Sequence, residues 1–138
     1  MKKNANKGFS LVELIIVIAI MAVLIGVLAP QFIKHVENSR QSTDMDNVQA
    51  IKTAMEAAYA DEALKTEETI TVGSGKITVS SNVATVCDGV ATETSLKSSG
   101  WASGSWTYST ANYTWSGTAA CANSKNTSKG NDMASIFK

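Results

Sequence analysis

Near the start of the chain a long apolar stretch ends at a proline. Residues 9 to 29, FSLVELIIVIAIMAVLIGVLA, are apolar except for Ser10 and Glu13. As a helix that rises 1.5 Å per residue, this stretch spans about 31 Å, which matches the hydrocarbon thickness of a bilayer. The pattern therefore predicts a transmembrane helix over residues 9 to 29.

Beyond the proline the pattern becomes amphipathic. Apolar residues recur three and four positions apart as far as Leu64, which predicts that the helix continues with one apolar face. Over residues 37 to 44 this face lapses into ENSRQSTD, so packing there must be against something small or polar. The face consists of Phe32, Val36, Val48, Ile51, Met55, Ala58 and Tyr59.

Gly26 and Pro30 are the expected weak points of this helix. A proline inside a helix removes one hydrogen bond and frees a carbonyl, which predicts a kink at Pro30. Gly26 lies four residues earlier and is expected to loosen the helix locally. Neither glycine nor proline interrupts the stretch from residue 31 to 64.

After Leu64 the spacing of apolar residues changes to the period of strands. Residues 70–72 and 76–79 flank Gly73-Ser74-Gly75, which predicts a hairpin. Aromatic residues alternate with threonine in 106–108 and 113–115, which predicts a second hairpin with its turn at 109–112. A weaker strand pattern covers 83–86, and the rest of 80–100 and 117–132 is expected to form loops. The predicted fold is α+β, with a long helix packed on a small antiparallel sheet.

Composition and charge narrow the possible functions. The 138 residues contain 12 basic and 12 acidic side chains, so no nucleic-acid partner is indicated. Lys2, Lys3 and Lys7 precede the apolar stretch, which predicts a cytoplasmic N-terminus and an exported C-terminal part. A secretory signal peptide is the rival interpretation, but its apolar region is shorter and ends in a small-x-small cleavage site.

The two cysteines, Cys87 and Cys121, lie in the exported part. A single pair in a small exported domain predicts a disulfide. Closing a loop of this size would stabilise the fold by about 3 to 5 kcal/mol. The alternative is two unconnected buried thiols.

No constellation of catalytic or metal-binding residues is evident. His35 is the lone histidine, so neither a zinc site nor a Ser-His-Asp triad is expected in the C-terminal part. Asp88 and Asp132 are too few for a calcium site. We expect no cofactor, no metal and no enzymatic activity. Most helix-associated acidic residues are expected on a solvated face, namely Asp44, Asp46, Glu56, Asp61, Glu62, Glu67 and Glu68.

One motif identifies a family. Lys7-Gly8-Phe9-Ser10-Leu11-Val12-Glu13-Leu14, followed by the apolar stretch and Pro30, resembles the class III leader junction of type IV pilins and pseudopilins. The resemblance covers about residues 1 to 40, and none is evident in the C-terminal part. It implies three parts, which are a leader (1–8), a long helix (9–64) with its transmembrane segment (9–29), and a β-rich head (65–138).

The resemblance also implies roles for single residues. In that family, prepilin peptidase cleaves after the glycine corresponding to Gly8, and the new N-terminal residue, Phe9, is methylated. A carboxylate inside the bilayer is costly and is by default a candidate functional group, so Glu13 needs a partner. The resemblance assigns it the Phe9 amine of a neighbouring subunit, whereas the alternative is that Glu13 reaches to the headgroups.

The implied function is that of a structural subunit. It would reside in the cytoplasmic membrane, and the pilus assembly machinery would polymerise it into a homo-oligomeric helical surface filament for adhesion, motility or DNA uptake. A type II secretion pseudopilin and a competence pseudopilin are alternatives within the superfamily. From another class, a monomeric membrane-anchored binding protein would need neither Gly8 nor Glu13.

Overall fold

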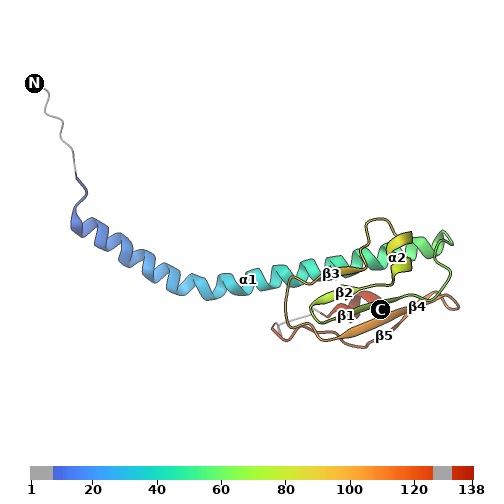
Figure 1. Ribbon diagram of the computed structural model, residues 1–138. Helices are drawn as coiled ribbons and strands as arrows, with labels where there is room; N and C mark the ends of the chain where they lie inside the picture. The colour runs from blue at the N-terminus through green and yellow to red at the C-terminus, as the bar shows by residue number, and fades with distance from the viewer. Residues whose placement is uncertain (1–7, 126–131) are drawn as a thin grey trace, which may run out of the picture. The chain divides into compact units, whose positions relative to one another are not determined.

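The computed structural model describes residues 8–125 and 132–138. The chain divides into two compact units, Met1–Val36 and Glu37–Lys138. One helix, α1 (Leu11–Ala60), supplies the described secondary structure of the first unit and continues into the second (Figure 1). We call the second unit the head and describe each unit by itself.

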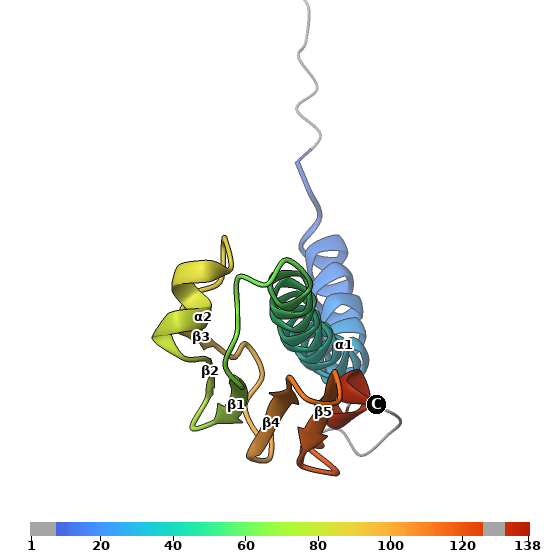
Figure 2. The ribbon, with the colours of Figure 1, turned by 90° about the vertical axis from the view of Figure 1, so that its right-hand side faces the viewer.

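The head is built on a five-stranded antiparallel sheet in the order β3-β2-β1-β4-β5. Its strands are β1 (Thr69–Gly73), β2 (Lys76–Thr78), β3 (Glu93–Ser95), β4 (Gly104–Ser109) and β5 (Thr114–Gly117). A short helix, α2 (Ser81–Val86), links β2 to β3, and a 3-10 helix, η1 (Met133–Phe137), follows β5. Figure 2 shows the part of α1 that belongs to the head lying across one face of this sheet.

The core of the head forms where the apolar face of α1 meets the sheet. Val48, Ile51 and Met55 are at most 7% exposed, and their spacing of three and four residues places them on one side of the helix. They belong to the same buried cluster as Ile70 of β1 and Trp106 of β4. Each fully buried side chain of this size contributes about 1.5 to 3 kcal/mol. The predicted α+β architecture is confirmed.

Both predicted hairpins are present, with differences in detail. β1 and β2 are joined through Ser74 and Gly75, and β4 pairs with β5 so that Ser109 lies opposite Thr114. Tyr113 therefore belongs to the turn and not, as predicted, to a strand. The strand pattern over 83–86 was misleading, because these residues form most of α2, which Ser80 caps by accepting the Val83 N–H at 3.3 Å.

The polar stretch of α1 contacts the head through a buried carboxylate. Asp44 is completely buried, and its Oδ1 accepts the Lys97 N–H at 2.7 Å. Its Oδ2 accepts the Ser98 N–H at 2.8 Å and the Trp101 indole N–H at 3.0 Å. The expectation that Asp44 lies on a solvated face is wrong, because the loop before β4 supplies the hydrogen bonds that water would otherwise make.

Glu68 is a second acidic residue that the helical pattern misplaced, and it is 8% exposed. Its carboxylate accepts hydrogen bonds from Ser80 Oγ at 2.5 Å, Asn82 Nδ2 at 2.7 Å and Thr66 Oγ1 at 3.0 Å. Burial alone would raise the pKa of Glu68, but these three donors outweigh it and lower the pKa below its usual value.

The predicted disulfide is wrong in this structure, where Cys87 and Cys121 are both free and buried. The Cys87 thiol donates to the Ala54 carbonyl of α1 at 3.6 Å, whereas the Cys121 thiol donates to the Ala102 carbonyl at 2.9 Å. Burial raises the pKa of both thiols, that of Cys121 to about 11 with a further contribution from Asp132. The alternative of two unconnected buried thiols is the one observed.

Candidate assembly site

The first turn of α1 contains the residues that the sequence singled out, and it is capped from within. The Leu14 N–H donates to the Ser10 carbonyl at 3.3 Å, which makes Ser10 the N-cap residue. Glu13 lies three residues after this cap. Its side chain turns back toward the start of the helix, and its Oε2 accepts the Ser10 backbone N–H at 3.1 Å. This is the carboxylate half of a capping box, and the negative charge is also favourable at the positive end of the helix dipole.

Glu13 thus has a partner inside its own chain. This local role was missed at the level of the sequence, although Ser10-Leu11-Val12-Glu13 has the S-x-x-E spacing that signals it. The hydrogen bond uses one carboxylate oxygen and a neutral N–H, so the negative charge is not neutralised. A cation brought close to the start of α1 would still be attracted.

Gly8 and Phe9 lie just before the helix, and both residues are exposed. A Cβ atom built on Gly8 would meet no atom within 4 Å, so the fold of this chain does not require glycine there. The Phe9 side chain is 84% exposed. If glycine is needed at position 8, the requirement comes from another molecule that must approach the backbone closely.

The first unit exposes its apolar side chains along all sides of the helix. Between Leu11 and Leu28, the exposed fraction of the large apolar residues ranges from 47% for Val17 to 73% for Leu11. Among the described residues, α1 is the one helix long and apolar enough to cross a membrane, and the most apolar window has a mean hydropathy of 3.1 with none of it buried. Such a surface is typical of a helix whose environment is lipid or other apolar helices.

Gly26 and Pro30 lie within this exposed part of α1. The helix is continuous through both residues, so the kink stays a prediction. A Cβ on Gly26 would also meet nothing within 4 Å. Because glycine inside a helix destabilises it by about 0.5–1 kcal/mol relative to alanine, its presence has no explanation within the subunit.

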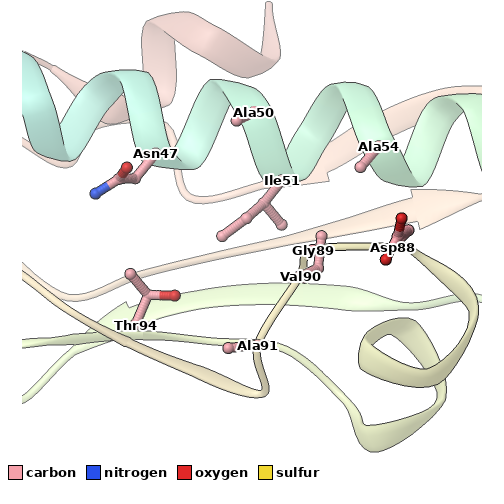
Figure 3. A pocket seen from close by; sticks show the side chains of 9 residues that line it. All are labelled: Asn47, Ala50, Ile51, Ala54, Asp88, Gly89, Val90, Ala91 and Thr94. Carbon is pink, nitrogen blue, oxygen red and sulfur yellow. The ribbon is translucent and has the colours of Figure 1, made fainter.

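In its described residues, 37–125 and 132–138, the head does not offer a comparable constellation of reactive groups. One pocket of the head has a volume of about 280 Å³. Its lining residues come from α1 and from the segment that follows α2 (Figure 3). Asn47, Asp88 and Thr94 are its polar lining residues, and Asp88 is its one ionisable group. General acid–base or nucleophilic chemistry needs a second group within hydrogen-bond reach, which this lining does not provide.

Comparisons with known proteins agree with the N-terminal features. A family model described as the prokaryotic N-terminal methylation motif matches residues 3–29. "Prepilin peptidase-dependent protein A" of Clostridium perfringens (strain 13 / Type A) is 34% identical over 82 residues, which are 57% of this chain and 59% of that protein. "Type IV major pilin protein PilA" of Myxococcus xanthus (strain DK1622) is 39% identical over 57 residues, 41% of this chain and 26% of that protein.

A further relative extends the same pattern. A "Fimbrial protein" of Pseudomonas aeruginosa is 36% identical over 58 residues, which are 42% of this chain and 38% of the relative. The chain therefore spans between about a quarter and three fifths of the length of these relatives. No solved structure matches the chain significantly.

The architecture is pilin-like, because a helix with an exposed apolar half continues into the packed core of a small α+β head. The N-terminal segment carries the prokaryotic N-terminal methylation motif, and about two fifths of the chain is similar to type IV pilin and fimbrial proteins.

Proposed function

We propose that this protein is the structural subunit of a type IV pilus, made as a precursor, cleaved after Gly8 and polymerised through α1 into a surface filament. The observation that carries the proposal is the apolar half of α1, whose large side chains are exposed on every side of the helix. Such a surface needs lipid before assembly and other helices afterwards, because in water it would aggregate. The subunit would thus pass from the cytoplasmic membrane to the cell surface.

Cleavage is supported by the openness of the junction. Gly8 has no neighbour that requires a glycine, so a peptidase that approaches the backbone closely explains the residue better than the fold does. One relative carries the name "Prepilin peptidase-dependent protein A", which supports the same enzyme as a partner of this chain. Cleavage would remove Lys2, Lys3 and Lys7 and leave α1 on the mature protein, with Phe9 as the methylated N-terminal residue.

Glu13 would then exchange a local partner for an intermolecular one. In the single chain its carboxylate accepts the Ser10 N–H, which leaves its charge uncompensated. The Phe9 amine of a neighbouring subunit would neutralise that charge and fix the axial register of two adjacent helices. An ion pair gains strength as water is excluded, so the contact would favour the bundled state.

The first experiment is the intact mass of protein sheared from the surface of cells that express the chain. We expect abundant material matching Phe9 to Lys138, one methyl group heavier, with both cysteines reduced. Unprocessed protein, or protein cleaved at another bond, would contradict the assigned junction. Processed protein confined to the membrane would favour a pseudopilin over a pilus subunit.

Two variants separate the local and intermolecular roles of Glu13. Glu13→Gln keeps an oxygen that can accept the Ser10 N–H but removes the charge, whereas Glu13→Ala removes both. If the charge sets the register, both variants are processed, stay in the membrane and form no filaments. Filaments from Glu13→Gln at the wild-type level would show that capping alone matters, and normal filaments from Glu13→Ala would exclude both roles.

A pseudopilin of a secretion or competence system is the second candidate. Cys87 and Cys121 are both free, so no disulfide in the head distinguishes a pilus subunit from a pseudopilin. The names of the relatives, a "Type IV major pilin protein PilA" and a "Fimbrial protein", favour the pilus. Adhesion, motility and DNA uptake are all compatible with such a filament.

A further inference from the structure

A second pocket of the head, of about 330 Å³, is lined by residues around the end of α1 and by the β4–β5 hairpin. Three tyrosines contribute to its wall, Tyr59, Tyr108 and Tyr113. Tyr59 and Tyr108 stack with their ring centroids 4.3 Å apart, and Tyr108 is 8% exposed. The volume falls in the lower part of the range for pockets that bind small molecules.

Tyr113 adopts a backbone conformation that is unfavourable for a bulky residue. Its φ is 57°, and its N–H closes the hairpin turn by donating to the Ser109 carbonyl at 2.9 Å. Glycine or asparagine takes this conformation with less strain. The Tyr113 side chain is 76% exposed, so burial does not offset the strain. Stability of the head therefore does not explain why a tyrosine is present in this turn.

Glu62, at the end of α1, also has a positive φ angle, which is unfavourable for a residue with a side chain. The Ala63 N–H donates to the Ala58 carbonyl at 2.9 Å and the Glu62 N–H to the Tyr59 carbonyl at 3.1 Å, the two bonds of a Schellman motif. Glu62, with φ 55°, occupies the position at which glycine is usual. Its exposed side chain lines the pocket.

Lys65 gives the pocket a positive charge opposite in sign to that of Glu62. Both side chains are exposed, and none of the ion pairs in the described part of the chain involves either of them. An exposed aromatic ring, an unpaired carboxylate and an unpaired ammonium group therefore line one hollow. A ligand that carries both a cation and an anion would satisfy all three groups.

We propose that this pocket binds phosphocholine. The trimethylammonium group would lie against the face of Tyr113, where the ring quadrupole attracts a cation, with Glu62 adding its negative charge. The phosphate would be held by Lys65, a flexible point charge suited to phosphate. An uncharged sugar would contact the aromatic ring but would leave the charges of Glu62 and Lys65 without an ionic partner.

Binding is tested with the full chain in micelles of a polyoxyethylene alkyl ether, which has no choline, sugar or charge in its headgroup. Soluble phosphocholine is titrated while the backbone amide signals of Lys65 and residues 110–113 are followed by NMR. We expect saturable shifts at these positions. Choline chloride should bind more weakly, because it lacks the group that Lys65 recognises.

Three variants make the test specific. Tyr113→Gly should weaken phosphocholine binding about tenfold or more, equivalent to about 1.4 kcal/mol, while the thermal midpoint of the head stays the same or rises. Lys65→Ala should reduce phosphocholine affinity to that of choline. Asn112→Ala, in the same turn but outside the pocket lining, should leave binding unchanged.

Three results would overturn the proposal: no saturable shift with phosphocholine, wild-type affinity in Tyr113→Gly, or binding of methyl glucoside at least as tight as that of phosphocholine. The source of the ligand is distinguished with glycerophosphocholine, a diester like a lipid headgroup. If the diester binds at least as tightly as the monoester, the site recognises a lipid headgroup. If the monoester is preferred, it recognises free phosphocholine, and either result supports the pocket.

Discussion

Replacing Asp44 by alanine should destabilise the head more than replacing any nearby exposed carboxylate. The Asp44 side chain is completely buried, and three N–H groups of the loop before β4 donate to it, at 2.7, 2.8 and 3.0 Å. No ion pair in the described part of the chain includes it. Its stabilising effect therefore comes from hydrogen bonds to a buried anion.

The magnitude follows from these contacts. A hydrogen bond to a charged group contributes about 1.5–3 kcal/mol, so three contribute roughly 4.5–9 kcal/mol if they are independent. Several kcal/mol of this are offset, because the alanine variant no longer has to desolvate a carboxylate. We expect Asp44→Ala to lower the free energy of unfolding by about 3–5 kcal/mol, a large part of the total for a small domain. Asp44→Asn keeps one acceptor and should cost about 2 kcal/mol or more.

Denaturant unfolding of the full chain in non-ionic micelles measures the effect. Tryptophan fluorescence is a suitable signal, because the Trp101 indole is one of the three donors to Asp44. Asp46→Ala is the matched control, since Asp46 lies two residues further along the same helix and is exposed. It should change the free energy of unfolding by less than about 0.5 kcal/mol. If both variants unfold at the same denaturant concentration, the argument from buried hydrogen bonds is wrong.

Other predictions address titratable and strained groups. Because the fold lowers the pKa of Glu68, the stability it confers is present at neutral pH and is lost as the pH falls through that lowered value, so Glu68→Gln should flatten the acid limb of a stability–pH curve. An unchanged acid limb would contradict this. Cys87 and Cys121 should not react with Ellman's reagent at pH about 8 until the protein unfolds, since burial raises the pKa of both. A native mass two hydrogens lighter than the reduced chain would refute the free thiols. Glu62→Gly should raise stability by up to about 1 kcal/mol, because glycine is favoured at this φ. A lower thermal midpoint would count against the strain at Glu62.

Local patterns in the sequence were sufficient for the main elements. The apolar stretch and the spacing of Val48, Ile51 and Met55 depend on helix periodicity, which any helix must obey. The first hairpin was predicted from the glycines in its turn, and the second from aromatic residues that alternate with threonine. The strand prediction over 83–86 was wrong because these residues belong to a short helix that Ser80 caps. Over so short a length, the same apolar residues fit a strand or a helix equally well.

What the sequence by itself determined is the part of this protein that depends on local order: an apolar helix long enough for a bilayer, the motif at Gly8 that predicts a leader junction, and the position of the Glu13 carboxylate in that helix. These features depend on the order of residues along one helix. Only the tertiary structure decided which acidic side chains are buried, that the two thiols bond to different carbonyls, and that Glu62, Lys65 and Tyr113 line one pocket. Those properties arise from contacts between segments far apart in the chain, and local periodicity carries no information about them.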